Sequence, residues 1–427
     1  MKQSNYNLLR EFDSNYYLIN VLNSTFIELS EYEYNELCKM DNSTFENISH
    51  DVLNKMIEQG MLVSDETDEL LFLKKRYIRE QKEKDLLTIT IAPTLNCNFA
   101  CPYCYEDRQG KIINKEEQRK IIDFIDKQLL LGYKKLNLIW FGGEPLLAFE
   151  AIKNMSKEII NICNKYEVNY NAFLTTNGYL LNDNVVKKLH ELKIQQLFIT
   201  LDGPEYIHNQ RRCLYSGKPT FGQITKNAVN AKNNGIETII RMNVDKSNEP
   251  YIEELRDYVT NILGLPMYLG LVREYTDSCN NEKNSYLTKQ EYALLQDIFE
   301  ENQSKDKKVE YLFPRQKPIY CRAVKVGTFV IDPDLNIYKC ENDIGRPNKR
   351  IANIDDYPFD DEIFQSYNQD YYKWDPFEYE DCCKCDILPI CMGGCPFIAI
   401  KEKKPECETY KYNFDNCIKK HILQHKL

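Results

Sequence analysis

The feature that most constrains the fold is an alternation of short apolar runs with helix-length amphipathic segments over residues 86–272. Runs rich in β-branched and aromatic residues indicate strands, and the segments between them indicate helices. This β–α repetition predicts an α/β fold with a parallel sheet and crossover helices. Six units are fewer than the eight of a closed barrel, so we expect a partial (β/α)6 barrel with a lateral opening. The expected strands are 86–93, 135–143, 172–178, 195–203, 237–244 and 267–272.

Unusual polar residues follow these strands. In parallel α/β folds, ligands and substrates bind at the carboxyl ends of the strands. Any one of the polar segments could be a simple turn, but their recurrence after successive strands predicts one shared site. The segments are "GGEP" (142–145), "TTNG" (175–178), "TLDGP" (200–204) and "RMNVD" (241–245).

After the first strand comes a cysteine triad, Cys97, Cys101 and Cys104, with the spacing C-x3-C-x2-C. A closed zinc site or an electron-transfer iron–sulfur cluster takes four protein ligands. Three thiolates on a [4Fe–4S] cluster leave one iron free for a small ligand that carries an amine and a carboxylate. A zinc site or a purely structural cluster is the alternative.

Residues near the triad are suited to such a ligand. Glu144 could hold an ammonium group, while Gly142 and Gly143 would allow close backbone approach. Tyr103 could lie against a flat ring. Arg212 could pair with a carboxylate in bidentate fashion.

"CNFACPYC" followed by "WFGGEPLL", "TTNG", "TLDGPEYIHNQRR" and "RMNVD" resembles the radical S-adenosylmethionine (SAM) superfamily over residues 86–275. The resemblance implies that the free iron chelates SAM and that the reduced cluster cleaves it to a 5′-deoxyadenosyl radical, which abstracts hydrogen. The SAM contacts that it implies are Tyr103, Gly142, Gly143, Glu144, Thr200 and Arg212.

The 16 cysteines and only five histidines favour iron–sulfur sites over mixed Cys/His zinc sites. Neither a secretion signal nor a membrane-spanning stretch is evident, so we expect a cytoplasmic protein whose cysteines serve as ligands rather than disulfides. The net charge of −10 argues against a nucleic-acid partner.

Nine cysteines lie in residues 321–417, too many for one metal site and enough for two. "CCKCDILPICMGGC" has the C-x2-C-x5-C-x3-C spacing and resembles the SPASM extension of radical SAM enzymes, which carries two auxiliary [4Fe–4S] clusters. The resemblance assigns the first cysteine group, Cys321, Cys340 and Cys395, to one cluster. It assigns the second cysteine group, Cys382, Cys385, Cys391 and Cys407, to the other.

This sequence departs from the SPASM pattern in two ways. A glycine usually lies five residues before the second cysteine, and here that residue is Leu335. The first group also has three ligands, so either one iron is open to a substrate thiolate or Cys417 or Cys383 completes it. Cys417 is also the alternative to Cys407. A zinc-ribbon-like tail is the structural alternative.

Residues 1–65 predict a winged-helix-like module, with strands at 15–22, 25–30 and 61–65 and helices at 31–40 and 46–60. The module resembles the recognition element that binds the leader of a ribosomally made peptide, with a cap on the barrel as the alternative. The remaining expected divisions are a linker helix (66–85), the barrel (86–275), a bridging region (276–320) and the SPASM domain (321–427).

Together these features predict a peptide maturase that joins a cysteine thiolate to carbon, with a precursor peptide and a flavodoxin- or ferredoxin-like reductase as partners. A carbon–carbon cross-link is the near alternative. An anaerobic sulfatase maturase is another, in which Glu341, directly after Cys340, would take the place of the family's aspartate base. A redox sensor or binding protein without SAM cleavage is the non-enzymatic alternative.

Overall fold

The structure is a computed structural model of the 427-residue chain, and it describes residues 1–39, 45–106, 110–273, 285–306, 313–359 and 367–425. The chain forms two compact units. No helix within the described ranges is long and apolar enough to cross a membrane. The first unit comprises residues 1–82, 289–322 and 373–427, and the second comprises 83–288 and 323–372.

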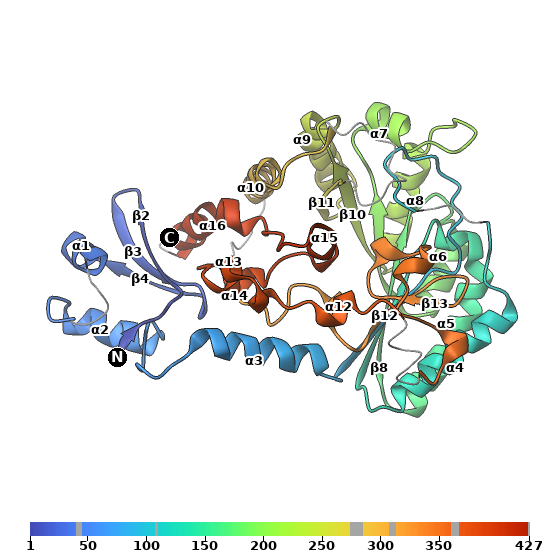
Figure 1. Ribbon diagram of the computed structural model, residues 1–427. Coiled ribbons are helices and arrows are strands. Elements are labelled where there is room, and N and C mark those ends of the chain that lie inside the picture. Colours follow the sequence, from blue (N-terminus) through green and yellow to red (C-terminus); the bar gives the residue numbers. More distant parts are fainter. Residues whose placement is uncertain (40–44, 107–109, 274–284, 307–312, 360–366, 426–427) are drawn as a thin grey trace. The chain divides into compact units, whose positions relative to one another are not determined.

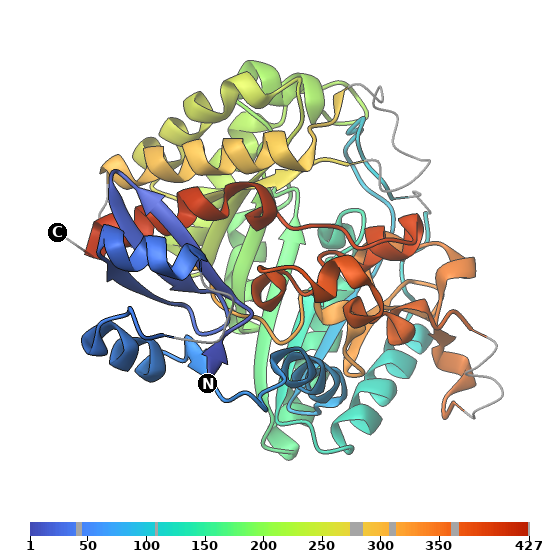
Figure 2. The ribbon, with the colours of Figure 1, turned by 60° about the vertical axis from the view of Figure 1, so that its left-hand side comes forward.

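A parallel sheet forms the centre of the second unit, and Figure 2 shows its strands side by side. Every apolar run predicted as a strand forms one, and neighbouring strands pair in parallel in the order β6 to β11. The α/β prediction of an open, partial barrel is confirmed. The strands are β6 (Leu86–Ile91), β7 (Lys135–Trp140), β8 (Asn169–Thr176), β9 (Ile194–Thr200), β10 (Glu237–Val244) and β11 (Met267–Leu271).

Three strands from the C-terminal part of the chain extend this sheet. β12 (Thr328–Ile331) pairs in parallel with β6, and β13 (Asn336–Tyr338) and β14 (Ala352–Asn353) follow in antiparallel order. The sequence analysis did not predict these strands. The stretch predicted as a SPASM domain, 321–427, therefore contributes to both units, and its limits as a functional domain stay a prediction.

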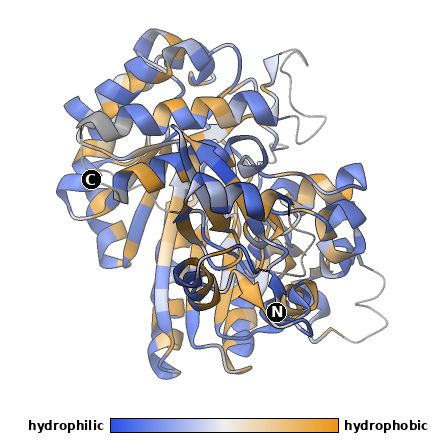
Figure 3. Cartoon of the chain, turned by 90° about the vertical axis from the view of Figure 1, so that its left-hand side faces the viewer, coloured by the Kyte–Doolittle hydropathy of each residue, from blue (hydrophilic) through white to orange (hydrophobic). Residues whose placement is uncertain are grey.

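Amphipathic helices connect the parallel strands. Asn114 caps α4 in a capping box with Glu117, and the Asn182 side chain caps α6, as the helix start signals of these segments favour. In Figure 3 hydrophobic and hydrophilic residues alternate along the helices, as expected when one face packs on a sheet. These helices are α4 (Lys115–Leu129), α5 (Phe149–Lys165), α6 (Asp183–Glu191), α7 (Glu205–Arg211), α8 (Phe221–Asn233) and α9 (Ile252–Asp257), with short turns at Pro145–Ala148, Glu249–Tyr251 and Tyr258–Ile262.

The N-terminal part of the first unit contains a three-stranded antiparallel sheet in the order β2-β3-β4. Its strands and helices are β1 (Lys2–Gln3), β2 (Asn7–Phe12), β3 (Asn15–Asn20), β4 (Thr25–Leu29), α1 (Glu31–Lys39), α2 (His50–Glu58), β5 (Leu62–Val63) and α3 (Glu69–Lys82). The predicted strands and helices all form here, with small shifts at their ends. Leu18, Ile27, Val52 and Met56 are part of the core between sheet and helices.

Strand β2 was not predicted from the sequence. "NLLREF" lacks the strict alternation of polar and apolar residues that indicates a strand. Asp13 and Ser14, with φ of 51° and 61°, form the turn to β3 in the left-handed region that two-residue hairpins require. The turn therefore creates a hairpin that residue periodicity alone did not reveal.

The rest of the first unit is helical. Figure 1 shows α10 (Lys289–Asp306) beside α16 (Tyr410–His425). Asp297 accepts hydrogen bonds from the Asn413 and Asn416 side chains, both at 3.0 Å. The short elements of the C-terminal part of the chain are Arg322–Val324, Glu341–Asp343, Pro347–Lys349, Ile354–Asp356, α12 (Asp370–Lys373), Pro376–Glu378, α13 (Glu380–Cys383), α14 (Leu388–Cys391) and α15 (Pro396–Glu402).

Candidate active site

The cysteine triad lies on the loop between β6 and α4, at the carboxyl end of the sheet. The loop is braced at several points. The Thr94 hydroxyl donates to the Lys111 carbonyl oxygen at 2.7 Å, and the Ala100 N–H donates to the Cys213 carbonyl at 3.0 Å. The first bond joins the two ends of the loop, and the second ties the loop to the backbone that follows α7.

Gly142 and Gly143, after β7, lie against the backbone of the triad loop. A Cβ on Gly142 would come within 2.4 Å of the Thr94 carbonyl oxygen, and one on Gly143 within 2.4 Å of the Asn96 carbonyl oxygen. The Gly143 N–H donates to the Thr94 carbonyl at 3.2 Å. The two glycines thus allow close backbone approach, and what they approach in the protein is the triad loop itself.

Glu144 is fully buried, and its carboxylate is occupied by the protein. It accepts hydrogen bonds from the Leu146 N–H at 3.0 Å, the Thr176 hydroxyl at 2.7 Å and the Asn177 N–H at 2.7 Å. Burial raises the pKa of this carboxyl, and the hydrogen bonds oppose that rise. The side chain joins the ends of β7 and β8, and it is absent from the described residues that line the pocket below.

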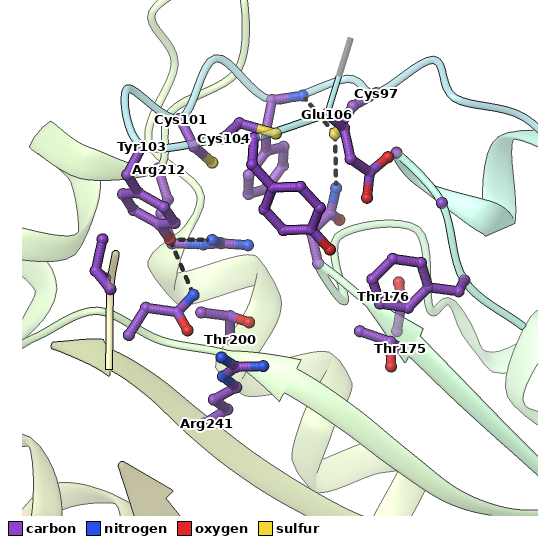
Figure 4. Close-up of a pocket in the computed structure, with 18 of the residues that line it drawn as sticks. Cys97, Cys101, Tyr103, Cys104, Glu106, Thr175, Thr176, Thr200, Arg212 and Arg241 are labelled. Atoms are coloured by element: carbon purple, nitrogen blue, oxygen red, sulfur yellow. Dashed lines mark hydrogen bonds between the residues drawn. The ribbon is translucent and has the colours of Figure 1, made fainter. Parts of the chain in front are cut away.

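A pocket of about 910 Å³, counting space open to solvent, lies beneath the triad. Figure 4 shows the three thiols along the loop on one side and Thr200 and Arg241 on the other. Of the residues predicted to contact SAM, those that line the pocket are Tyr103, Gly142, Gly143, Thr200 and Arg212.

Tyr103 and Arg212 form a buried network in this pocket. The Tyr103 hydroxyl accepts a hydrogen bond from Arg212 Nη1, as Figure 4 shows, and it donates one to Asp202 Oδ2. Arg212 Nη1 also lies 3.9 Å from the Asp202 carboxylate. Arg212 is only 8% exposed, and its Nε has no hydrogen-bond partner among the described residues. The guanidinium is therefore fixed in place with one donor unused.

The sequence analysis named the motifs of several further lining residues without singling the residues out. Arg241 and Asn243 project from β10, two positions apart and hence on one face of the strand. Asn177 donates to Cys97 Sγ at 3.9 Å. "RMNVD" and "TTNG" were the available signals, because polar residues at alternate positions near a strand end face the same site.

The donor chemistry of the pocket fits an iron–sulfur cluster with a polar cofactor. Burial raises the pKa of the Cys97 thiol to about 12, so the free thiol stays protonated until a metal ion displaces the proton. Within the part of the chain that the structure describes, no three His, Cys, Asp or Glu side chains converge closely enough to hold a single metal ion. In a cubane cluster each thiolate binds a different iron, so its ligands are spaced more widely.

Residues 91–259, which contain the triad and most of the parallel strands, match the model of the radical SAM superfamily. The chain contains a radical SAM domain. The family implies a [4Fe–4S] cluster and SAM, which the triad and the pocket chemistry fit.

Two curated relatives cover most of the chain. A cysteine-type anaerobic sulfatase-maturating enzyme of Clostridium perfringens is 22% identical over 77% of this chain and 95% of its own length. The radical SAM cyclopropyl synthase TigE of Paramaledivibacter caminithermalis is 21% identical over 88% of this chain and 84% of its own.

Solved structures support the radical SAM fold. Native anSMEcpe with bound AdoMet and Cp18Cys peptide has a TM-score of 0.61 at 20% identity, covering 78% of this chain and 98% of that one. Streptococcus suis SuiB bound to precursor peptide SuiA has a TM-score of 0.56 at 19% identity, covering 96% and 98%. The SPASM-like C-terminal part of this radical SAM enzyme is consistent with these folds.

The second cysteine group of the radical SAM enzyme converges within the first unit. Burial, and then the nearby thiols of Cys391, Cys385 and Cys407, raise the pKa of the Cys382 thiol to about 12. The Lys411 ammonium donates to Cys385 Sγ at 3.8 Å. Four thiols within electrostatic range of one another fit the ligand set of a cluster.

Cys417 lies in other surroundings, whereas Cys383 is close enough to Cys382 to contribute to the raised pKa of that thiol. Cys417 Sγ is 4.0 Å from Asp297 Oδ1, between α10 and α16, and Cys383 Sγ is 3.3 Å from the Phe377 carbonyl oxygen. Cys407 helps to raise the pKa of both the Cys382 and the Cys391 thiol. This arrangement favours Cys407 over Cys417 as a ligand, which stays a prediction.

The first cysteine group is divided between the units. Cys321 and Cys395, in the first unit, both help to raise the pKa of the Tyr320 hydroxyl. Cys340, in the second unit, follows β13 and helps to raise the pKa of the Tyr371 and Tyr105 hydroxyls.

Two residues near Cys340 are informative. Glu341 Oε1 accepts a hydrogen bond from the Thr90 hydroxyl at 3.0 Å. Leu335 has a φ of 66°, in the left-handed region that favours glycine. The usual SPASM glycine at this position therefore has a conformational reason, and Leu335 keeps that conformation here while its side chain is buried.

Replacing Cys407 with Ala should remove about one cluster's worth of iron from the anaerobically purified enzyme, since one of four converging ligands is lost. Replacing Cys417 with Ala, the matched control, should leave the iron content unchanged. Iron and sulfide analysis of the two variants measures this. Equal loss from both variants, or loss from Cys417→Ala alone, would contradict the assignment.

Proposed function

We propose that this radical SAM enzyme is a maturase of a ribosomally made peptide. In this proposal the triad holds the SAM-binding cluster. Tyr103, Gly142, Gly143, Thr200 and Arg212 contact SAM from the pocket lining. Glu144, which does not line the pocket, contacts SAM through Oε2, which accepts one hydrogen bond among the described residues. The observation that carries the site assignment is the convergence of the triad loop with Tyr103, Thr200 and Arg212 on one pocket.

The reduced cluster with bound SAM supplies a 5′-deoxyadenosyl radical. The protein's own residues hold and orient these groups. Gly142 and Gly143 keep the triad loop in place, and the buried Tyr103–Asp202–Arg212 network presents a fixed guanidinium that can pair with a carboxylate. Because the network is assembled before any ligand arrives, binding requires little reorganisation.

The peptide assignment rests on the N-terminal module. Its sheet ends in strands β2 and β4, and a free strand edge can take an extended peptide as an added strand. The SuiB structure, whose fold covers 96% of this chain, is described as bound to its precursor peptide. That description supports a peptide partner, and leader binding through residues 1–65 is our proposal for where it binds.

The product that we propose is a thioether. Formation of the C–S bond would transfer one hydrogen atom from a core carbon to the radical, release the proton of the cysteine thiol, and release one electron, which the auxiliary clusters would accept. The peptide thus loses two hydrogens. The auxiliary clusters are held by the first and second cysteine groups, and a flavodoxin- or ferredoxin-like reductase supplies electrons in the cytoplasm.

Two other products have support. The Clostridium perfringens relative is named a sulfatase-maturating enzyme, which supports formylglycine formation with Glu341 as the base. TigE is named a cyclopropyl synthase, which supports a carbon–carbon bond.

Anaerobic co-expression with a short Cys-containing peptide encoded beside the enzyme tests the proposal, with intact mass and thiol alkylation as readouts. A loss of two hydrogens with one cysteine blocked is the expected result. The same mass loss with every thiol still alkylable would indicate a carbon–carbon bond. SAM cleavage without any change in peptide mass would favour the sulfatase-maturase alternative.

A further inference from the structure

Glu408 follows Cys407 at the start of α16 and is the centre of a polar cluster in the first unit. Its Oε1 accepts a hydrogen bond from the Tyr320 hydroxyl and lies 3.3 Å from the Lys289 ammonium. Its Oε2 accepts from the Thr409 N–H at 3.1 Å and the Thr409 hydroxyl at 3.2 Å. The carboxylate is therefore held on both oxygens.

The same residue lies beside the second cysteine group and, through Tyr320, near two cysteines of the first. On one side, the Glu408 backbone N–H donates to the Cys391 thiol, and Cys407 is its covalent neighbour. On the other side, its partner Tyr320 lies within electrostatic range of Cys321 and Cys395. A single residue thus joins the second cysteine group to two members of the first.

The cluster is largely shielded from water. The side chains of Glu408 and Lys289 are 13% and 18% exposed, and that of Glu406, which lies 3.8 Å from Lys289, is 14% exposed. Charges in such surroundings act more strongly than they do in water. Net charge, hydrogen bonding and solvent exposure are the protein's means of setting a cluster's reduction potential.

We propose that Tyr320 is a positioning residue that acts through Glu408, and that this pair couples the two auxiliary sites electrostatically. The Glu408 carboxylate lowers the reduction potential of the cluster at the second cysteine group, and the Tyr320 hydroxyl sets how strongly it does so. The inference rests on the proposed function, because it needs the auxiliary clusters, but it does not need the peptide.

A purely structural role is the competing explanation, since Glu408 also satisfies Thr409 at the start of α16. That role would affect folding and iron retention. It would not explain why the effect of Tyr320→Phe on a reduction potential disappears when Glu408 is replaced. The test therefore measures potentials in a double-mutant cycle.

The experiment uses the full chain with Cys97, Cys101 and Cys104 replaced by Ala, reconstituted with iron and sulfide, so that only the auxiliary sites contribute. Redox titration monitored by electron paramagnetic resonance gives the midpoint potentials. Glu408→Gln should raise the reduced-to-oxidised ratio of the second cluster about tenfold at a fixed potential, or about 59 mV for a one-electron couple. Tyr320→Phe should lower that ratio about threefold.

In the Glu408→Gln background, Tyr320→Phe should have no further effect. The matched control is Glu406→Gln, which removes the same charge beside Cys407 and Lys289 but is not the carboxylate to which the Tyr320 hydroxyl donates. In that background the effect of Tyr320→Phe should persist. Additive effects of Tyr320→Phe and Glu408→Gln, or unchanged potentials in both, would overturn the inference.

The outcomes separate the inference from the proposed function. If the triad variant retains no iron after reconstitution, the auxiliary sites and this inference fail together. If the coupling is found but no peptide is modified, the coupling stands and the peptide assignment fails.

Discussion

Replacing Cys97, Cys101 and Cys104 together with Ala is expected to abolish 5′-deoxyadenosine formation while the enzyme keeps its auxiliary iron. The triad is the only group of three cysteines at the carboxyl ends of the described parallel strands, and SAM cleavage requires a cluster there. The second cysteine group lies in the other unit and should bind iron independently. Chromatography of SAM cleavage products and iron analysis of the same sample measure both effects.

Cys163→Ala is the matched control for this prediction. Cys163 is a buried thiol within α5, whose pKa burial raises to about 11, and it does not line the pocket. Its replacement should leave cleavage and iron content unchanged. If the triple variant still cleaved SAM, or lost all of its iron, the division into three iron sites would be wrong.

Gly143→Ala should reduce SAM cleavage about 10²-fold, the cost of a displacement near 1 Å at a catalytic site. The added Cβ would lie 2.4 Å from the Asn96 carbonyl oxygen and 2.5 Å from that of Leu95. Both are backbone atoms of the triad loop, so the loop itself must move. The free energy of unfolding should fall by about 1–3 kcal/mol, measured by anaerobic chemical denaturation.

Gly222→Ala is the control for that change. Gly222 lies in α8, where an added Cβ meets no atom within 4 Å. It should raise the free energy of unfolding by about 0.5–1 kcal/mol and leave cleavage unaffected. Wild-type cleavage in Gly143→Ala would show that the triad loop tolerates displacement, which contradicts the bracing inferred from the two glycines.

The parallel sheet could be predicted from sequence because its strands are buried apolar runs with polar residues at one end. The position of the site followed from the same pattern. β2 was not predicted, since its hairpin depends on the left-handed backbone of Asp13 and Ser14 rather than on periodicity. β12 was not predicted either, because its pairing partner, β6, lies more than 200 residues earlier in the chain.

Glu144 shows a different limit of sequence reasoning. Its place in "GGEP" indicated an acidic group beside the triad, but the sequence could not reveal that the carboxylate is already bonded to Leu146, Thr176 and Asn177. Hydrogen-bond partners of a buried group come from tertiary contacts between strand ends. A short motif fixes the residue type and its approximate place, not its partners.

The pairing of β12 with β6 has a consequence for the span between iron sites. The strands are in register from Thr328 opposite Thr88 to Ile331 opposite Ile91, about 4.8 Å apart. One leads to the triad and the other to the hairpin that carries Cys340, and Tyr105 is within electrostatic range of both Cys104 and Cys340. The pairing of these strands therefore fixes the separation of the two backbone segments from which the triad loop and the Cys340 hairpin extend. Shifting one strand along the other would require a register slip, which turns every side chain of that strand to the opposite face. Substitutions along β6 and β12 can therefore change the side chains beside this span while the spacing of the two strands is kept.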